Sequence, residues 1–109
     1  MDDLDPEDPF ELDGRNRPHL AKHDHFSEAD LLDIYYDAVY YPASEGGAAH
    51  WLMVGRPPGE EPLVVPLAPS NSGDPTKARP IGIYRATGTL LADYLIDTGQ
   101  AQPLRRGER

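Results

Sequence analysis

The sequence contains no cysteine and no long apolar run, and these two absences remove whole classes of protein. Without thiols there is no disulfide and no thiolate metal ligand, which fits a reducing compartment. No stretch approaches the roughly 20 apolar residues that span a bilayer, and the first residues are acidic where a secretory signal is basic. We therefore expect a cytoplasmic protein that does not bind membranes.

A basic excess is missing as well, because 19 acidic residues against 10 Lys and Arg give a formal net charge of −9. Seven of these acids lie in residues 1–13, so the rest of the chain is close to neutral. Tight nonspecific binding to DNA or RNA depends on a strongly basic surface. The composition counts against such binding, but it leaves room for a local basic cleft.

What the chain does contain fits one small domain built from short elements. It has 109 residues, with 12 Pro and 10 Gly to make turns. Residues 1–9 are acidic, hold two prolines and have few apolar groups, which predicts a disordered, flexible acidic arm. We expect a single domain over residues 10–98 and a flexible tail over 99–109.

Three helices are predicted from local signals. Pro18 suits the first turn of a short helix that ends near His23. Ser27 and Asp30 form a loose capping box at the start of "SEADLLDIYY", a helix with one apolar face. Leucines and a tyrosine at helical spacing in "TGTLLADYLIDTG" predict a third helix that ends at Gly99.

Between the second and third helices, the pattern changes to strands. Four segments rich in β-branched and aromatic residues are separated by turn residues, and they are "AVYYPA" (38–43), "HWLMVGR" (50–56), "PLVVPLAP" (62–69) and "RPIGIYRA" (79–86). Pro66 predicts that the third strand is short or lies at an edge. The polar segment 70–78 is a candidate functional loop. The expected fold is α+β, with two N-terminal helices, a three- to four-stranded antiparallel sheet and a C-terminal helix.

The stretch "RNRPHLAKHDHF" (15–26) concentrates histidine and basic residues. His19 and His23 are spaced i, i+4 on a predicted helix and are followed by Asp24 and His25, a spacing that can hold zinc. No fourth ligand is evident, so packed or solvated histidines are the favoured interpretation. We therefore predict no metal and no cofactor.

The same stretch contains groups that ribonuclease chemistry needs. A metal-independent ribonuclease must deprotonate a 2′-hydroxyl, stabilise a phosphorane and protonate the leaving oxygen. Lys22 and His23 are candidates, with Arg79, Tyr84 and Arg85 of the last strand as companions. Strand alternation places Arg79 and Arg85 on one face and Tyr84 on the other, unless a bulge intervenes. From spacing alone, Arg85 is better explained as a surface or carboxylate-paired arginine.

The order of these segments resembles the BrnT-type toxins of type II toxin-antitoxin modules, which are small ribonucleases of the RelE-like superfamily. The resemblance covers about residues 10–96 and is carried by Phe10, Asn16, Lys22-His23, Ser27, Gly55-Arg56, Arg79 and Arg85-Ala86. It implies a RelE-like fold, a metal-independent endoribonuclease acting on RNA, and a protein antitoxin as partner. The implied catalytic residues are Lys22, His23, Tyr84 and Arg85, and the implied RNA-binding residues are Arg56, Lys77 and Arg79.

In that scheme Lys22 and Arg85 stabilise phosphate charge, His23 or Tyr84 handles protons, and Arg79 positions the RNA backbone. The chain departs from the family pattern at Asp24, which replaces a glycine, and at Tyr84, which replaces an arginine. Together with the acidity, these departures support an alternative, a noncatalytic protein-binding module on the same fold. The sequence does not specify the oligomeric state.

Aromatic residues and the acidic arm complete the sequence-based expectations. Trp51 and Met53 share a strand face, which predicts a core tryptophan rather than a base-stacking surface. The tyrosines at 35, 36, 40 and 41 are expected to pack in the core or at its rim. The acidic arm has two further interpretations: a pseudosubstrate folded over the basic cluster, or a contact for a basic partner.

Overall fold

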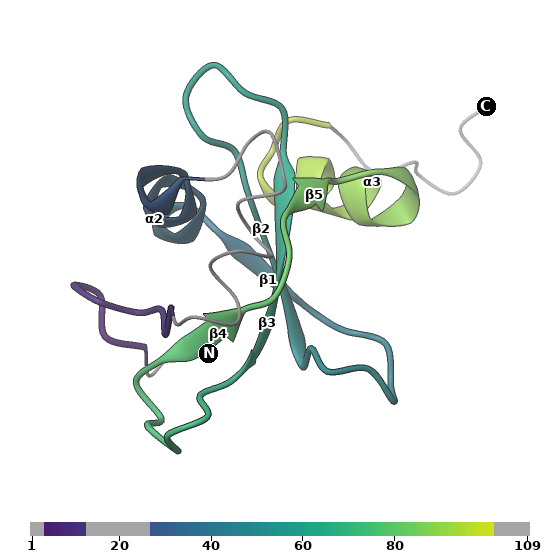
Figure 1. The fold of residues 1–109 in the computed structure, drawn as a ribbon. Helices are drawn as coiled ribbons and strands as arrows, with labels where there is room; N and C mark the ends of the chain where they lie inside the picture. The colour runs from purple at the N-terminus through teal and green to yellow at the C-terminus, as the bar shows by residue number, and fades with distance from the viewer. Residues whose placement is uncertain (1–3, 13–26, 102–109) are drawn as a thin grey trace.

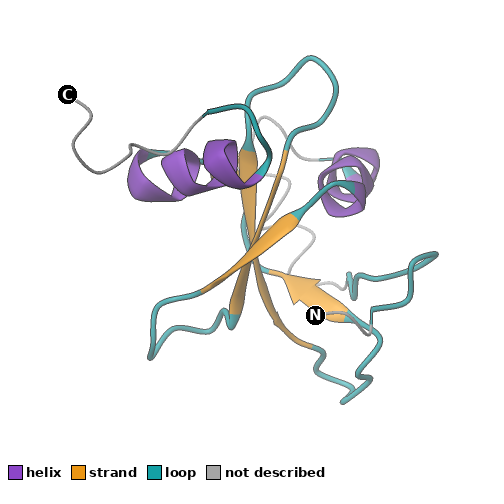
Figure 2. Cartoon of the chain, turned by 180° about the vertical axis from the view of Figure 1, so that it is seen from behind, coloured by secondary structure: helices purple, strands orange, loops and turns teal. Residues whose placement is uncertain are grey.

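The computed structural model describes residues 4–12 and 27–101, where an antiparallel sheet carries one helix on each face (Figures 1 and 2). The α+β class and the antiparallel sheet are as expected. The helix predicted over residues 18–23 lies outside the described residues. In chain order the elements are α2 (Glu28–Tyr36), β1 (Val39–Pro42), β2 (Trp51–Gly55), β3 (Leu63–Pro69), β4 (Ala78–Pro80), β5 (Tyr84–Arg85) and α3 (Gly88–Asp97).

Both described helices begin and end close to the predicted positions. The Ser27 hydroxyl accepts a hydrogen bond from the Asp30 backbone N–H at 3.0 Å, which confirms the predicted cap of α2. Gly99 has φ +75°, the left-handed conformation expected just after a helix, and it follows the end of α3. Neither helix of the described part is long and apolar enough to cross a bilayer.

The sheet is built around β3, which has neighbours on both sides. Strands β1, β2 and β3 pair in sequence order, and β4 and β5 both pair with the other edge of β3. The expectation that Pro66 makes the third strand short or an edge strand is therefore wrong. The Pro66 carbonyl accepts a hydrogen bond from the Ile81 N–H at 3.0 Å, so it faces β4 and β5. The carbonyl and the amide nitrogen of one strand residue point to the same neighbour, so the N–H that proline lacks would be missing on the side of β4 and β5 and not on the side of β2. The sheet tolerates Pro66 because that side is interrupted opposite it, between β4 and β5.

This interruption contains a bulge that changes which side chains share a face. Arg79 lies opposite Ala68, whereas Arg85 lies opposite Leu63, so six steps along the last strand match five along β3. The extra residue reverses the alternation. Tyr84 consequently shares the face of Arg79, and Arg85 lies on the opposite face, which corrects the expectation that the two arginines share one.

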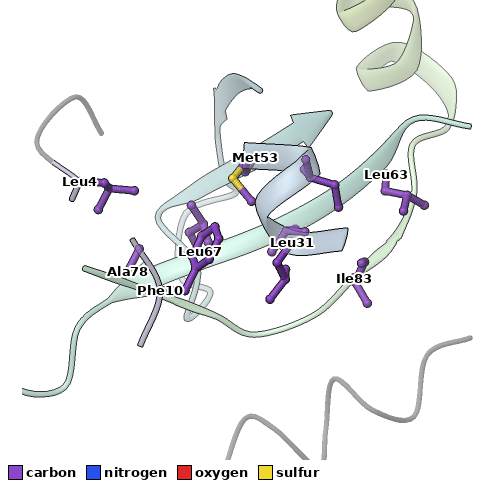
Figure 3. Close-up of a cluster of buried hydrophobic side chains, with 10 residues drawn as sticks. Leu4, Phe10, Leu31, Met53, Leu63, Leu67, Ala78 and Ile83 are labelled. Atoms are coloured by element: carbon purple, nitrogen blue, oxygen red, sulfur yellow. The ribbon is translucent and has the colours of Figure 1, made fainter. Parts of the chain in front are cut away.

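The core has two layers, one on each face of the sheet. On the α2 face, Leu31 and Ile34 pack with Met53 and with neighbouring apolar side chains of β3 and the N-terminal segment (Figure 3). On the α3 face, Tyr94 packs with apolar side chains of β2 and β3. Leu31 and Met53 are buried, as the spacing in α2 and β2 predicts, but the second fully buried residue of α2 is Ile34 and not Tyr35 or Tyr36, which the sequence pattern also places on the apolar face.

Residues 4–12 pack against the sheet, which differs from the flexible arm expected for residues 1–9. The Ala78 N–H donates to the Pro9 carbonyl at 2.9 Å, and the Glu11 N–H donates to the Ala78 carbonyl at 2.8 Å. Phe10 forms a parallel bridge with Ala78, and Leu4 and Phe10 are buried. The acidic composition of this segment predicts a solvated arm, but its apolar side chains Leu4 and Phe10 pack beside β4.

The tyrosine run packs largely as expected. Tyr35 contacts the Phe10 ring edge-on at a centroid distance of 5.7 Å, and the Tyr41 hydroxyl donates to the Asp97 carboxylate at 2.6 Å. Burial first, and the Asp97 hydrogen bond second, raise the pKa of Tyr41. Tyr36 is the exception, because its side chain is 63% exposed. Tyr35 thus links α2 to the N-terminal segment, and Tyr41 links β1 to α3.

Candidate functional site

The predicted site residues that the structure describes fall into two groups at different ends of the sheet. Arg85 lies opposite Leu63 and Arg79 opposite Ala68, five residues further along β3. At about 3.4 Å per residue these positions are about 17 Å apart. Lys22 and His23 lie outside the described residues. The described candidates therefore do not converge on one phosphate group.

The first group lies where β5 pairs with β3. The Arg85 guanidinium is 3.4 Å from the Glu61 carboxylate, and both side chains are mostly exposed. Tyr84 is 46% exposed on the other face, and partial burial raises the pKa of its hydroxyl, so it is protonated at neutral pH. Arg56 is exposed just after β2. Arg85 is therefore a surface arginine paired with a carboxylate, as its position in the sequence pattern predicts.

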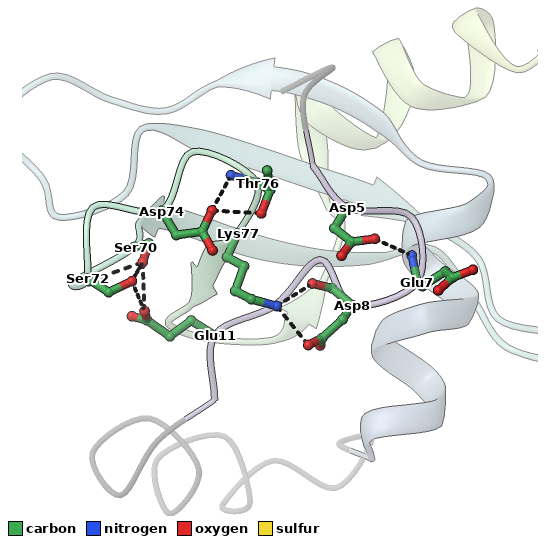
Figure 4. Close-up of polar contacts among 9 residues, drawn as sticks. All are labelled: Asp5, Glu7, Asp8, Glu11, Ser70, Ser72, Asp74, Thr76 and Lys77. Carbon is green, nitrogen blue, oxygen red and sulfur yellow. Dashed lines mark hydrogen bonds and ion pairs between the residues drawn. The ribbon is translucent and has the colours of Figure 1, made fainter.

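The second group is engaged by the N-terminal segment. Lys77 Nζ donates to the Asp8 backbone carbonyl at 2.8 Å and to the Asp8 carboxylate at 2.7 Å (Figure 4). The Asp8 hydrogen bond raises the pKa of Lys77. This ammonium already has a carboxylate at hydrogen-bonding distance, so its role in the described structure is to hold residue 8 against the loop.

Arg79 and Glu11 form the next contact along the same edge. Arg79 Nε is 3.2 Å from Glu11 Oε2, and the two side chains are only 13% and 18% exposed. The Glu11 carboxylate also accepts hydrogen bonds from the Ser70 hydroxyl at 2.6 Å and the Asn71 N–H at 2.9 Å. These bonds, the one from Ser70 most strongly, lower the pKa of Glu11. Glu11 was not singled out in the sequence, where it reads as one acid among seven.

The loop predicted to be functional, residues 70–78, is closed by its own hydrogen bonds. Asp74 Oδ1 accepts from the Thr76 N–H at 2.9 Å and from the Thr76 hydroxyl at 2.7 Å (Figure 4). The same bonds lower the pKa of Asp74, so its carboxylate is ionised at neutral pH. The loop therefore presents a fixed negative charge near the beginning of β4.

A cavity of about 240 Å³ opens between this loop and the start of β2. Leu4, Ala68 and Ala78 contribute apolar surface, Trp51 and His50 line the β2 side, and Asp74 and Lys77 line the loop side. Of the predicted site residues that the structure describes, Lys77 alone lines this cavity. The one sequence feature that indicates this cavity is the polar loop over residues 70–78, which lines one of its sides.

Trp51 is 38% exposed beside this cavity, which corrects the expectation of a core tryptophan. The face assignment holds, because Trp51 lies opposite Leu67 of the α2-facing layer. The nine residues of α2 form a helix of about 13 Å, which covers only part of that face. Trp51, the first residue of β2, lies opposite the last residue of β1, beyond the region that α2 packs against.

Within residues 4–12 and 27–101, no three His, Cys, Asp or Glu side chains come together as metal ligands. The cluster of His19, His23, Asp24 and His25 lies outside those ranges.

No protein-family model matches the chain, and neither does any curated protein or any solved structure. Functional inference therefore depends on the chain's own chemistry.

Proposed function

We propose that this domain is a noncatalytic protein-binding module whose contact surface is the cavity beside Trp51. A partly exposed tryptophan that lines a cavity with both apolar and charged walls carries the proposal. Tryptophan is enriched among the residues that dominate protein interfaces, because a large ring gains much from leaving water. The sequence contains a single tryptophan, and it is at this surface.

The charges near the cavity support a protein partner over RNA. Lys77 and Arg79, which would attract phosphates, each have an acidic partner from the N-terminal segment. Displacing those acids would break the ion pairs between the N-terminal segment and this edge of the sheet. The net charge of −9 adds a long-range repulsion toward any polyanion.

Site-specific photo-crosslinking in the native cell tests this function. With a benzophenone side chain in place of His50, we expect a discrete protein adduct that disappears when Trp51→Ala is added. A benzophenone at Tyr36, exposed on α2 and outside the cavity, is the matched control and should not form that adduct. The function is rejected if folded protein forms no adduct at position 50, or forms one regardless of Trp51.

A second candidate is the BrnT-like toxin, a metal-independent endoribonuclease with a RelE-like fold and a protein antitoxin. What favours it is the exposure of Tyr84 and Arg85 on β5, with Arg56 exposed at the end of β2. In this candidate Lys22 and Arg85 stabilise phosphate charge, and His23 or Tyr84 moves protons.

The test of the toxin candidate is cleavage of a mixed RNA by the purified protein with a chelator present. Activity that Arg85→Ala removes, and that Glu61→Gln leaves unchanged, would establish a ribonuclease with Arg85 in its site. Intact RNA in the presence of folded protein would favour the binding module.

A further inference from the structure

We propose that the cavity beside Trp51 receives the side chain of an arginine from an extended segment of the partner protein. This inference depends on the protein-binding function proposed above and adds the chemistry of the contact. It follows from the size of the cavity, from its aromatic and apolar lining, and from the charge around its opening.

The size of the cavity restricts its occupant to about one long side chain. Its volume of about 240 Å³ lies below the roughly 300 to 1,000 Å³ typical of sites for drug-sized ligands and cofactors. A nucleotide or a folded helix would not enter it. A side chain presented by an extended backbone would enter it without rearrangement of the sheet.

The lining suits a side chain with an apolar stem and a flat cationic end. Leu4 and Ala78 supply apolar surface against which methylene groups can pack. The indole of Trp51 is the strongest cation–π acceptor among protein side chains. An arginine can use both features at once, because its guanidinium stacks on an indole while its stem lies along apolar groups.

The charge at the opening selects a cation. Asp74 Oδ1 is occupied by Thr76, while Oδ2 accepts no hydrogen bond within the described part of the chain. Lys77 is the cation on the loop side of the cavity, and the carboxylates of Asp5, Asp8 and Asp74 all act on it. Because Asp8 neutralises the Lys77 ammonium at 2.7 Å, the Asp74 carboxylate is the negative charge that the described lining presents to an occupant, and it disfavours phosphate groups and acidic peptides.

Arginine is preferred over lysine for two physical reasons. A guanidinium donates several hydrogen bonds from one plane and so can address the Asp74 carboxylate while stacking on Trp51. An ammonium is more strongly hydrated and loses more on entering a partly apolar cavity. The expected order of affinity is therefore arginine, then lysine, then a neutral isostere.

The test is titration of the whole protein with the peptide acetyl-Gly-Gly-Arg-Gly-Gly-amide, followed by tryptophan fluorescence. Because the chain has one tryptophan, the signal reports on this cavity. We expect saturable binding in the millimolar range, weakened about fivefold when citrulline, which is neutral and of the same shape, replaces arginine. Equal binding of the two peptides would overturn the inference.

Two variants locate the binding. Asp74→Asn keeps an oxygen for the Thr76 hydrogen bonds but removes the charge, and it should weaken the arginine peptide about fivefold. Asp93→Asn removes the same charge from the exposed side of α3, away from the cavity, and should leave affinity unchanged. An Asp74→Asn protein that is folded and binds like the wild type would also overturn the inference.

The crosslinked partner separates this inference from the underlying function. An adduct that depends on Trp51, and whose contact segment contains an arginine needed for the adduct, supports both. A Trp51-dependent adduct with a segment that lacks arginine overturns the arginine inference and leaves the binding function standing. If the adduct is a second copy of this chain, or if peptide binds but no Trp51-dependent adduct forms, the proposed partner protein is rejected.

Discussion

The two ends of the sheet differ in how much charged contacts add to apolar burial. Where α2 and α3 cover it, Leu31, Ile34, Met53 and Val54 are fully removed from water. At the other end, buried Leu4 and Phe10 are accompanied by ion pairs, which link the N-terminal segment to the loop 70–78 through Lys77–Asp8 and to β4 through Arg79–Glu11. Apolar burial contributes much of a domain's stability, whereas an ion pair with an exposed partner, such as Lys77–Asp8, contributes little.

The two ends of this small sheet therefore have different roles. The covered end supplies a frame that depends little on pH, because its fully buried side chains are apolar. The end with the cavity adds ionised contacts to its buried Leu4 and Phe10, so part of its stability depends on pH. Partner binding is proposed at that second end, where a locally adjustable surface does not endanger the fold.

The largest expected effect is at the centre of the covered end. Ile34→Ala leaves a cavity beneath α2 and should lower the free energy of unfolding by about 2 to 5 kcal/mol. The measurement is the midpoint of denaturant unfolding. Tyr36→Ala on the exposed side of the same helix should change it little. A small effect at Ile34 would contradict the view that burial by α2 dominates stability.

The next effect comes from the close approach of β2 to α2. A Cβ at Gly55 would collide with the backbone carbonyl of Ile34, which cannot move without shifting the helix. Gly55→Ala should therefore cost about 1 to 3 kcal/mol in thermal or denaturant unfolding. Gly82→Ala is the matched control, since the added Cβ would meet Pro66 Cδ at 3.7 Å, an ordinary contact. Similar losses for the two variants would refute this packing account.

A smaller, pH-dependent effect is expected at the cavity end. The hydrogen bonds lower the folded-state pKa of Glu11 below its ordinary value of about 4.5. The stabilisation is therefore present above that value and is lost as the pH falls through the folded-state pKa. Glu11→Gln should reduce stability at neutral pH and flatten its dependence on pH below about 4.5. Thermal unfolding of the two proteins from acid to neutral pH measures this, and parallel profiles would count against the prediction.

The smallest effect is expected for the exposed ion pair on β5. Arg85→Ala should change the unfolding free energy by less than about 1 kcal/mol, because the Arg85 and Glu61 side chains are 61% and 73% exposed. Added salt should make wild type and variant still more alike. A loss of several kcal/mol would show that this pair has a structural role its exposure does not suggest.

Much of the fold could be predicted, and most of the site could not. Ser27, Gly99 and the strand alternation are local signals, and the structure follows them. The side of the sheet on which Tyr84 lies depends on a bulge between β4 and β5. The position of residues 4–12 depends on hydrogen bonds to β4, almost 70 residues away in the sequence. The predicted roles of Lys22 and His23 stay predictions.

Within the described residues, the sequence by itself determined where α2, α3 and the first three strands form, because caps, turns and hydrophobic periods act over a few residues. Only the tertiary structure decided that Pro66 lies in a central strand and that Arg79 pairs with Glu11. It also decided that Trp51 extends past the end of α2 to the side of a cavity. These features arise from contacts between distant segments, whose register and reach depend on how the whole chain packs.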